Sequence, residues 1–242
     1  MRRVPRLSLW IVLVAAFLAA SSGCGRDRPA LVTPAAPAGD FYPLAVGNQW
    51  RYALSRTVLI VLNGDTLAPT VQHLIEEREL VAVDTTSGDT YFVEHSRLFD
   101  AAGTDTLHDT RFLRQDDTGL YAAGGAGGEE STLLSYPLEP GARWIVNPQG
   151  PPVTLIVEGA DTLGLAGGFV GAYRIRRESL SLSPEDSSHV WYGYCGRIRS
   201  AVHRETMAMD VLTGDIALIV TDDATELAGV SLVSPGRCPV FP

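Results

Sequence analysis

One nine-residue pattern occurs twice in the chain, and this repeat constrains the fold more than any other feature of the sequence. Residues 42–50 and residues 136–144 both read Y-P-L-x-x-G-x-x-W. Proline fixes the backbone angle φ, and glycine tolerates the positive φ values that other residues avoid. Each copy therefore predicts a fixed turn that delivers a tryptophan to the start of a strand. The residues concerned are Gly47 and Trp50 in the first copy and Gly141 and Trp144 in the second.

The first 23 residues have the three parts of a bacterial export signal. Three arginines precede an apolar run at residues 7–20, which is shorter than the roughly 20 residues that span a bilayer. Small residues then lead to Gly23 and Cys24, as in bacterial lipoproteins whose cysteine is lipidated and becomes the first residue of the mature chain. We therefore expect export, palmitate or a related acyl chain on Cys24, and anchoring in the cell envelope at the outer membrane. Ordinary cleavage nearby and an uncleaved anchor are the alternatives.

The domain organisation follows from composition. Residues 1–23 are the signal peptide, and residues 24–40 are rich in Pro and Ala, which is typical of an extended tether. Residues 41–242 form the β-rich domain, and the repeated motif suggests two halves within it, 41–128 and 129–242.

The segments beyond the tether alternate between strand-like and turn-like composition. Residues 50–62 are rich in β-branched and aromatic residues and end at Asn63 and Gly64, a strong hairpin signal. Residues 70–83 suit a long strand, although propensity also allows a helix over residues 74–81. We predict an all-β fold: an antiparallel meander of about ten or more strands in one curved sheet or two packed sheets, with no major helix after the signal peptide.

The charge of the chain excludes one class of partner. Removing the first 23 residues leaves 16 arginines against 28 acidic residues, a formal charge of −12, and the sequence contains no lysine. A chain this acidic, with no basic cluster, is a poor candidate for binding nucleic acid. The expected partners are the membrane, through the lipid on Cys24, and an apolar ligand or an envelope protein.

Three segments together carry a family resemblance. Residues 134–144, 167–175 and 191–198 contain P-L-x-x-G-x-x-W, G-G-F and W-Y-x-x-x-G. In these motifs the chain resembles a set of uncharacterised bacterial envelope lipoproteins, and the resemblance extends over most of the chain after the signal. It implies a β-rich, surface-anchored domain, and it brings no known activity, catalytic residue or cofactor. Where that family tends to have Gly-Val-Gly, this chain has Tyr-Cys-Gly at residues 194–196.

The two cysteines that remain after lipidation of Cys24 are Cys195 and Cys238. Free thiols tend to pair in an oxidising envelope, so we expect a disulfide between them. Such a bond would pin the carboxyl-terminal tail, which contains too much Pro and Gly to form a regular element.

The sequence offers no strong catalytic or metal-binding motif. The five histidines lack zinc spacing, and no serine lies in a nucleophile elbow, so no metal and no cofactor are expected. Glu76, Glu77 and Glu79 are interpreted as solvated strand edges. The pairs Asp116-Asp117 and Asp222-Asp223 are interpreted as turn residues. The histidines are His73, His95, His108, His189 and His203.

The leading hypothesis is a non-enzymatic, lipid-anchored binding or interaction module. One alternative is a carbohydrate-active hydrolase that uses Glu76 or Glu79 with Asp109. Another is a structural or assembly partner, which an exposed apolar patch would favour. An open apolar cavity would indicate a carrier, whereas a filled interior would indicate an interaction module. The tryptophans, including Trp191, are expected to fill the core rather than line a sugar or lipid pocket.

Overall fold

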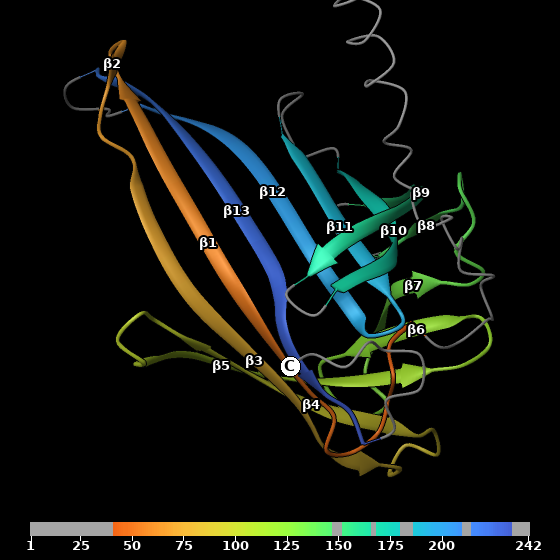
Figure 1. The fold of residues 1–242 in the computed structure, drawn as a ribbon. Helices are drawn as coiled ribbons and strands as arrows, with labels where there is room; N and C mark the ends of the chain where they lie inside the picture. The colour runs from red at the N-terminus through yellow and green to blue at the C-terminus, as the bar shows by residue number, and fades with distance from the viewer. Residues whose placement is uncertain (1–40, 147–151, 166–167, 180–185, 210–213, 234–242) are drawn as a thin grey trace, which may run out of the picture. The chain divides into compact units, whose positions relative to one another are not determined.

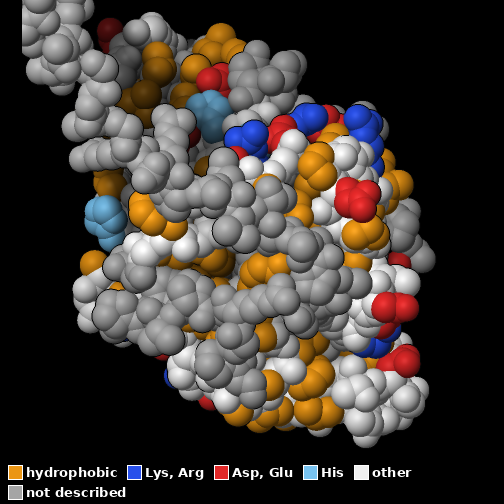
Figure 2. All heavy atoms as spheres, turned by 45° about the vertical axis from the view of Figure 1, so that its right-hand side comes forward, with side chains coloured by type: hydrophobic (Ala, Val, Ile, Leu, Met, Phe, Trp, Pro, Cys, Tyr) orange, Lys and Arg blue, Asp and Glu red, His pale blue; other side chains and the backbone are white. Residues whose placement is uncertain are grey.

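The protein is described by a computed structural model that covers residues 41–146, 152–165, 168–179, 186–209 and 214–233. These residues form thirteen strands and contain no helix, which confirms the predicted all-β class (Figure 1). No helix among them is long and apolar enough to cross a membrane. The predicted signal peptide, the predicted tether, Cys24 and Cys238 lie outside the described residues, whose side chains are coloured by type in Figure 2. The strands are β1 (Gln49–Leu62), β2 (Asp65–Thr66), β3 (Thr70–Asp84), β4 (Tyr91–Phe99), β5 (Asp105–Gln115), β6 (Gly119–Ala123), β7 (Glu130–Ser135), β8 (Arg143–Ile145), β9 (Val153–Leu165), β10 (Gly168–Ser179), β11 (Ser187–Gly193), β12 (Gly196–Met209) and β13 (Ile216–Ser231).

The described strands form one curved sheet rather than two packed sheets. Its order is β7-β6-β5-β4-β3-β1-β13-β12-β11-β10-β9-β8, with β2 paired only to β1. The first long strand and the last therefore lie side by side in the middle of the sheet. The edge strands β7 and β8 follow each other in the chain and also contact each other, so the sheet is nearly closed and barrel-like.

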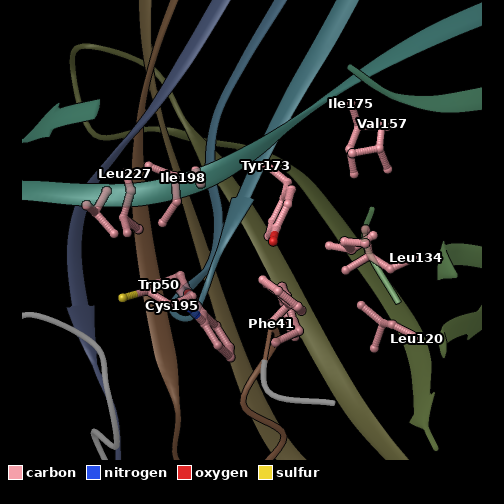
Figure 3. Packing of buried hydrophobic residues seen from close by; sticks show 14 of the residues in the cluster. Phe41, Trp50, Leu120, Leu134, Val157, Tyr173, Ile175, Cys195, Ile198 and Leu227 are labelled. Carbon is pink, nitrogen blue, oxygen red and sulfur yellow. Dashed lines mark hydrogen bonds between the residues drawn. The ribbon is translucent and has the colours of Figure 1, made fainter. Parts of the chain in front are cut away.

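Aromatic side chains fill the inside of the curved sheet (Figure 3). Trp50 is 1 % exposed and Trp144 is 9 % exposed, so both tryptophans are buried as expected. The Trp50 indole N–H donates to the carbonyl oxygen of Cys195 over 2.6 Å, and Phe41 stacks on Tyr194. We call this side of the sheet the inner face and the opposite side the outer face.

The two copies of the repeated motif build the same turn. In the first, the N–H of Gly47 donates to the carbonyl of Leu80 over 2.7 Å. In the second, the N–H of Gly141 donates to the carbonyl of Val157, also over 2.7 Å. A register shift follows Leu80 in the β3–β4 pairing and another follows Val157 in the β9–β10 pairing. The motif is therefore architectural, although its first copy leads into the central strand β1 and its second lies between the two sheet edges.

Both motif glycines have a positive φ, which predicts a measurable cost of replacing them. The φ angles are +94° at Gly47 and +89° at Gly141. A Cβ at Gly47 would lie 3.1 Å from Val233 Cγ2, whereas one at Gly141 would meet nothing within 4 Å. We expect Gly141→Ala to lower the free energy of unfolding by roughly 1–3 kcal/mol through backbone strain alone, and Gly47→Ala to lower it further. Chemical denaturation of the two variants tests this order, and negligible losses at both positions would contradict it.

Two local predictions are confirmed and a third is wrong. The Asn63-Gly64 hairpin is confirmed, with φ of 50° and 92°, and residues 70–84 form a strand rather than a helix. The assignment of Asp222 and Asp223 to a turn is wrong, because β13 runs through both without interruption. Their carboxylates are held by neighbouring strands: Asp223 binds Arg56 over 2.7 and 3.0 Å, and Asp222 binds His203 over 2.6 Å.

Candidate functional site

A groove of about 750 Å³ crosses five neighbouring strands of the sheet. Its lining comes from β13, β1, β3, β4 and β5, which are far apart in the sequence but adjacent in the sheet. At the β13 end of the groove, Gly229 lies opposite Arg51. Because glycine has no side chain, this end of the groove is open.

The register explains which side chains share the groove. Residues that face each other in an antiparallel pair project from the same face of a sheet. One row runs Arg51, Glu77, Arg97 and His108 across β1, β3, β4 and β5. The next row in the same face runs Gln49, Glu79, His95 and Thr110. Both rows project from the outer face, because Trp50 and Arg78 between them project inward.

The charged side chains in the groove form long, exposed ion pairs. Glu77 lies 3.8 Å from Arg51 and 3.7 Å from Arg97, and all three side chains are at least 38 % exposed. The Arg97 guanidinium also lies 5.7 Å from the centre of the Phe99 ring. Exposed ion pairs of this kind contribute about 0–1 kcal/mol, so the groups can exchange partners at little cost.

On the inner face, the neighbouring positions of the same strands hold a buried ion network. Glu94 is fully buried; it accepts from Arg111 and from the hydroxyl of Tyr42, and it lies 3.5 Å from Arg78. Arg78 also donates to Glu76 over 2.7 Å, and Glu76 binds Arg197 of β12 on its other side. The network therefore links β3, β4, β5 and β12 inside the curved sheet.

The electrostatics of the network favour its charged form. Burial alone would raise the pKa of Glu94, but the charges of Arg111 and Arg78 outweigh it and lower the pKa below its ordinary value. In the same way, Arg78 and Arg197 outweigh burial at Glu76 and lower its pKa. Burial raises the pKa of Tyr52 to about 12, which keeps the phenol neutral. Within the described residues, the hydroxyl of Tyr52 has no hydrogen-bond partner.

These contacts correct the interpretation of Glu76 as a solvated edge residue. Its side chain is only 14 % exposed, because position 76 shares the inner face with Arg78. Glu77 projects from the other face, as expected for adjacent strand residues, and Glu79 accepts from Gln49 over 3.0 Å in the groove. Glu79 and Asp109 both border the groove, but Asp109 is in register with Ser96 and Arg78, whose row projects inward.

The remaining predicted site residues occupy structural positions. Cys195 is fully buried and disulfide-bonded. Its expected partner, Cys238, lies outside the described residues, so that pairing stays a prediction. Trp191 is partly buried against the core, and its indole N–H donates to Asp161 over 2.7 Å. Trp50 and Trp144 belong to the core itself.

The described residues contain no group of three or more His, Cys, Asp or Glu side chains placed to hold a metal ion. Three histidines instead contact acids: His108 binds Asp105 over 2.7 Å, and His189 lies 3.4 Å from Glu158. The third, His203, lies 3.4 Å from Glu205. His203 binds Asp222, and this hydrogen bond raises the pKa of the imidazole above its ordinary value of 6.5.

Sequence reasoning missed the groove residues Arg51, Arg97, His95 and His108 as a group. Each lies at an unremarkable position in its own strand, and only the register across four strands brings them together. The available signal was the polar residues at alternate positions of one strand, as at His95 and Arg97, which indicate a polar face.

Comparisons with known proteins find similar solved structures but no family. The chain is similar to a candidate exported protein with a YmcC-like fold from Bacteroides fragilis NCTC 9343, with 13% identity, a TM-score of 0.47, and coverage of 80% of this chain and 100% of that one. It is also similar to a candidate lipoprotein from Parabacteroides distasonis ATCC 8503, with 12% identity, a TM-score of 0.42, and coverage of 81% and 100%. No protein-family model and no curated protein matches the chain.

Proposed function

We propose that the protein is a lipid-anchored envelope protein that acts as a non-enzymatic interaction module and engages an envelope protein through the outer groove. The observation that carries this proposal is the location of the hollow. The inside of the curved sheet is packed with aromatic side chains and the buried ion network, whereas the 750 Å³ groove lies on the outer face. A packed interior supports an interaction module over a carrier of apolar ligands.

The chemistry of the groove supports a protein as the partner. Arg51, Arg97 and Glu77 present both signs of charge on one open surface, and each is half-exposed. Side chains of protein partners offer the complementary charges, and such patterns set specificity more than raw affinity. An apolar ligand would gain little there, because the two rows that face outward carry mainly charged and polar side chains.

The positions of the acids support a role without catalysis. A glycoside hydrolase needs one carboxyl group that stays protonated as the general acid. The two arginine partners of Glu76 lower its pKa despite burial. A lowered pKa favours the ionised carboxylate, whereas a general acid must be protonated. Glu79 and Asp109 project from opposite faces of the sheet by register, so they do not flank a common substrate.

A second surface supports the alternative that the protein is a structural or assembly partner in the envelope. The strands β1, β12 and β13 extend away from the closed part of the sheet (Figure 1). Large apolar side chains on and beside this extension are exposed. Met207 is 73 % exposed and Met209 is 63 % exposed. Several large apolar side chains exposed in one region of a surface can mark a contact site. We call this surface the apolar tip; it consists of Leu62, Leu67, Val71, Met207, Met209 and Ile216.

Site-specific photo-crosslinking of the full chain in intact cells tests the proposed function. We expect a photoreactive residue at Arg97 or Gln49 to give the same protein adduct, because both line the groove. Arg143 is the control position, since it is exposed on β8 and lies outside the groove lining. Arg51→Glu should abolish the adduct from Gln49 by reversing a groove charge. Equal adducts from all three positions, or an adduct insensitive to Arg51→Glu, would contradict binding through the groove.

A further inference from the structure

A second, smaller hollow lies at the sheet edge where β11 begins. Its volume is about 320 Å³, at the lower end of the range of about 300–1,000 Å³ that ligand sites occupy. The first residue of β11, Ser187, pairs with His203 of β12. β12 continues beyond His203 to Met209, so this stretch has no paired strand on its β11 side among the described residues. The hollow forms at that step in the sheet.

Two arginines that have no partner among the described residues line this hollow. Ten of the thirteen described arginines form ion pairs with acids. Arg143, Arg177 and Arg204 make no ion pair or hydrogen bond in the described structure, and the last two line the hollow together. Acids outnumber arginines in this chain, so partners for these two are not scarce. Their placement in one hollow, with neither forming an ion pair to an acid, therefore indicates a site for an external anion.

The register places further donors beside the arginines. Ser188 pairs with Val202, and Arg204 lies two residues further along β12, so these side chains share a face. Arg177 follows Arg176, whose pairing with His189 puts position 177 next to Ser188. Ser188 is only 7 % exposed, and its hydroxyl makes no hydrogen bond in the described structure although it lines the hollow. Thr206, two residues beyond Arg204, adds a second hydroxyl.

One acid, Asp186, also lines the hollow, but its carboxylate is already engaged. Its Oδ1 atom accepts the backbone N–H of Glu205 over 2.7 Å. This contact takes the place of the hydrogen bond that a longer β11 would make to β12. Two unpaired guanidinium groups against one engaged carboxylate leave the hollow with a positive balance.

We propose that this hollow binds a phosphate group, held by Arg177 and Arg204 and by the hydroxyls of Ser188 and Thr206. Guanidinium groups match the oxygens of phosphate with paired N–H donors, and charge-assisted hydrogen bonds are the strong ones. A tetrahedral dianion accepts from more directions than a planar carboxylate, so two arginines and two hydroxyls favour phosphate. The group could be part of a lipid headgroup or of a soluble phosphorylated molecule, since the contacts are the same.

Calorimetric titration of inorganic phosphate into the full chain, purified in a neutral detergent at constant ionic strength, tests the proposal. We expect saturable binding that Arg177→Gln and Arg204→Gln each weaken by roughly ten- to a hundredfold, the effect of losing one charge-assisted hydrogen bond. Arg143→Gln is the matched control, because it removes the third unpaired arginine, on β8, and should leave binding unchanged. Acetate at the same concentrations should bind at least tenfold more weakly.

Several results would overturn the site. They are an unchanged affinity in the Arg177→Gln/Arg204→Gln double variant, an equal loss in Arg143→Gln, and acetate binding as tight as phosphate. The source of the phosphate is separated by titrating soluble dihexanoyl phosphatidic acid. Binding tighter than that of inorganic phosphate, and weakened by the same two variants, indicates a lipid headgroup. Binding no tighter than that of inorganic phosphate indicates a soluble phosphorylated molecule.

Discussion

Glu94→Gln should lower the free energy of unfolding by about 3–5 kcal/mol, the typical cost of removing one partner from a buried ion pair. Glu94 is fully buried and compensates the charges of Arg78 and Arg111 while it accepts from Tyr42. Glutamine keeps nearly the same shape but removes the negative charge, so two guanidinium groups stay inside the sheet with less compensation. Chemical denaturation at neutral pH measures the loss.

The matched control is Glu77→Gln. Glu77 belongs to the same sheet and also contacts two arginines, but its side chain is 38 % exposed and the contacts are 3.7 and 3.8 Å long. Water replaces such contacts readily, so we expect a change within about 0.5 kcal/mol. If Glu94→Gln costs no more than Glu77→Gln, the buried network does not stabilise the fold as inferred.

The buried ion network also predicts how the stability difference between wild type and Glu94→Gln depends on pH. In the folded protein, the pKa of Glu94 lies below its ordinary value of 4.5, because Arg111 and Arg78 outweigh burial. A group whose folded pKa is lowered contributes stability that is fully present above its unfolded pKa and is lost as pH falls through the folded value. The gap between wild type and Glu94→Gln should therefore be constant near neutrality and shrink below pH 4.5.

The sequence predicted the local elements well because turn chemistry and strand composition act over short distances. The Asn63-Gly64 turn and the long strand at residues 70–84 both follow from their own residues. Local patterns could not predict the closure of the sheet. The pairing of β1 with β13 joins residues as distant as Gln49 and Ser231, and no local pattern specifies it.

The candidate site was less predictable because it depends on register. Glu76 and Glu77 are neighbours in the sequence, yet one is buried in the ion network and the other lies in the groove. Which of them faces inward is set by pairing with β1, where Glu76 opposes the buried Tyr52. The turn predicted at Asp222 and Asp223 was wrong for the same reason. Arg56 and His203 on the neighbouring strands bind these aspartates and override their preference for turns.

Cys238→Ser should lower the free energy of unfolding by roughly 4 kcal/mol, the chain-entropy value for a loop of this length. Cys195 is disulfide-bonded, and the chain has only two other cysteines, Cys24 and Cys238. An acylated Cys24 cannot form a disulfide, so a lipid anchor on Cys24 leaves Cys238 as the partner of Cys195 within the chain. Trp50 donates to the carbonyl of Cys195, so the loss of the bond should also loosen the centre of the core.

Cys24→Ala separates the two roles of the cysteines. This variant should keep its stability and release the protein from the membrane fraction, because it removes only the acylation site. Mass spectrometry of the native chain should find an acyl mass on Cys24, and alkylation under denaturing, non-reducing conditions should find no free thiol. Cys238→Ser should expose one thiol, at Cys195. If Cys24→Ala exposes that thiol instead, Cys24 is the disulfide partner, and the proposed lipid anchor is wrong.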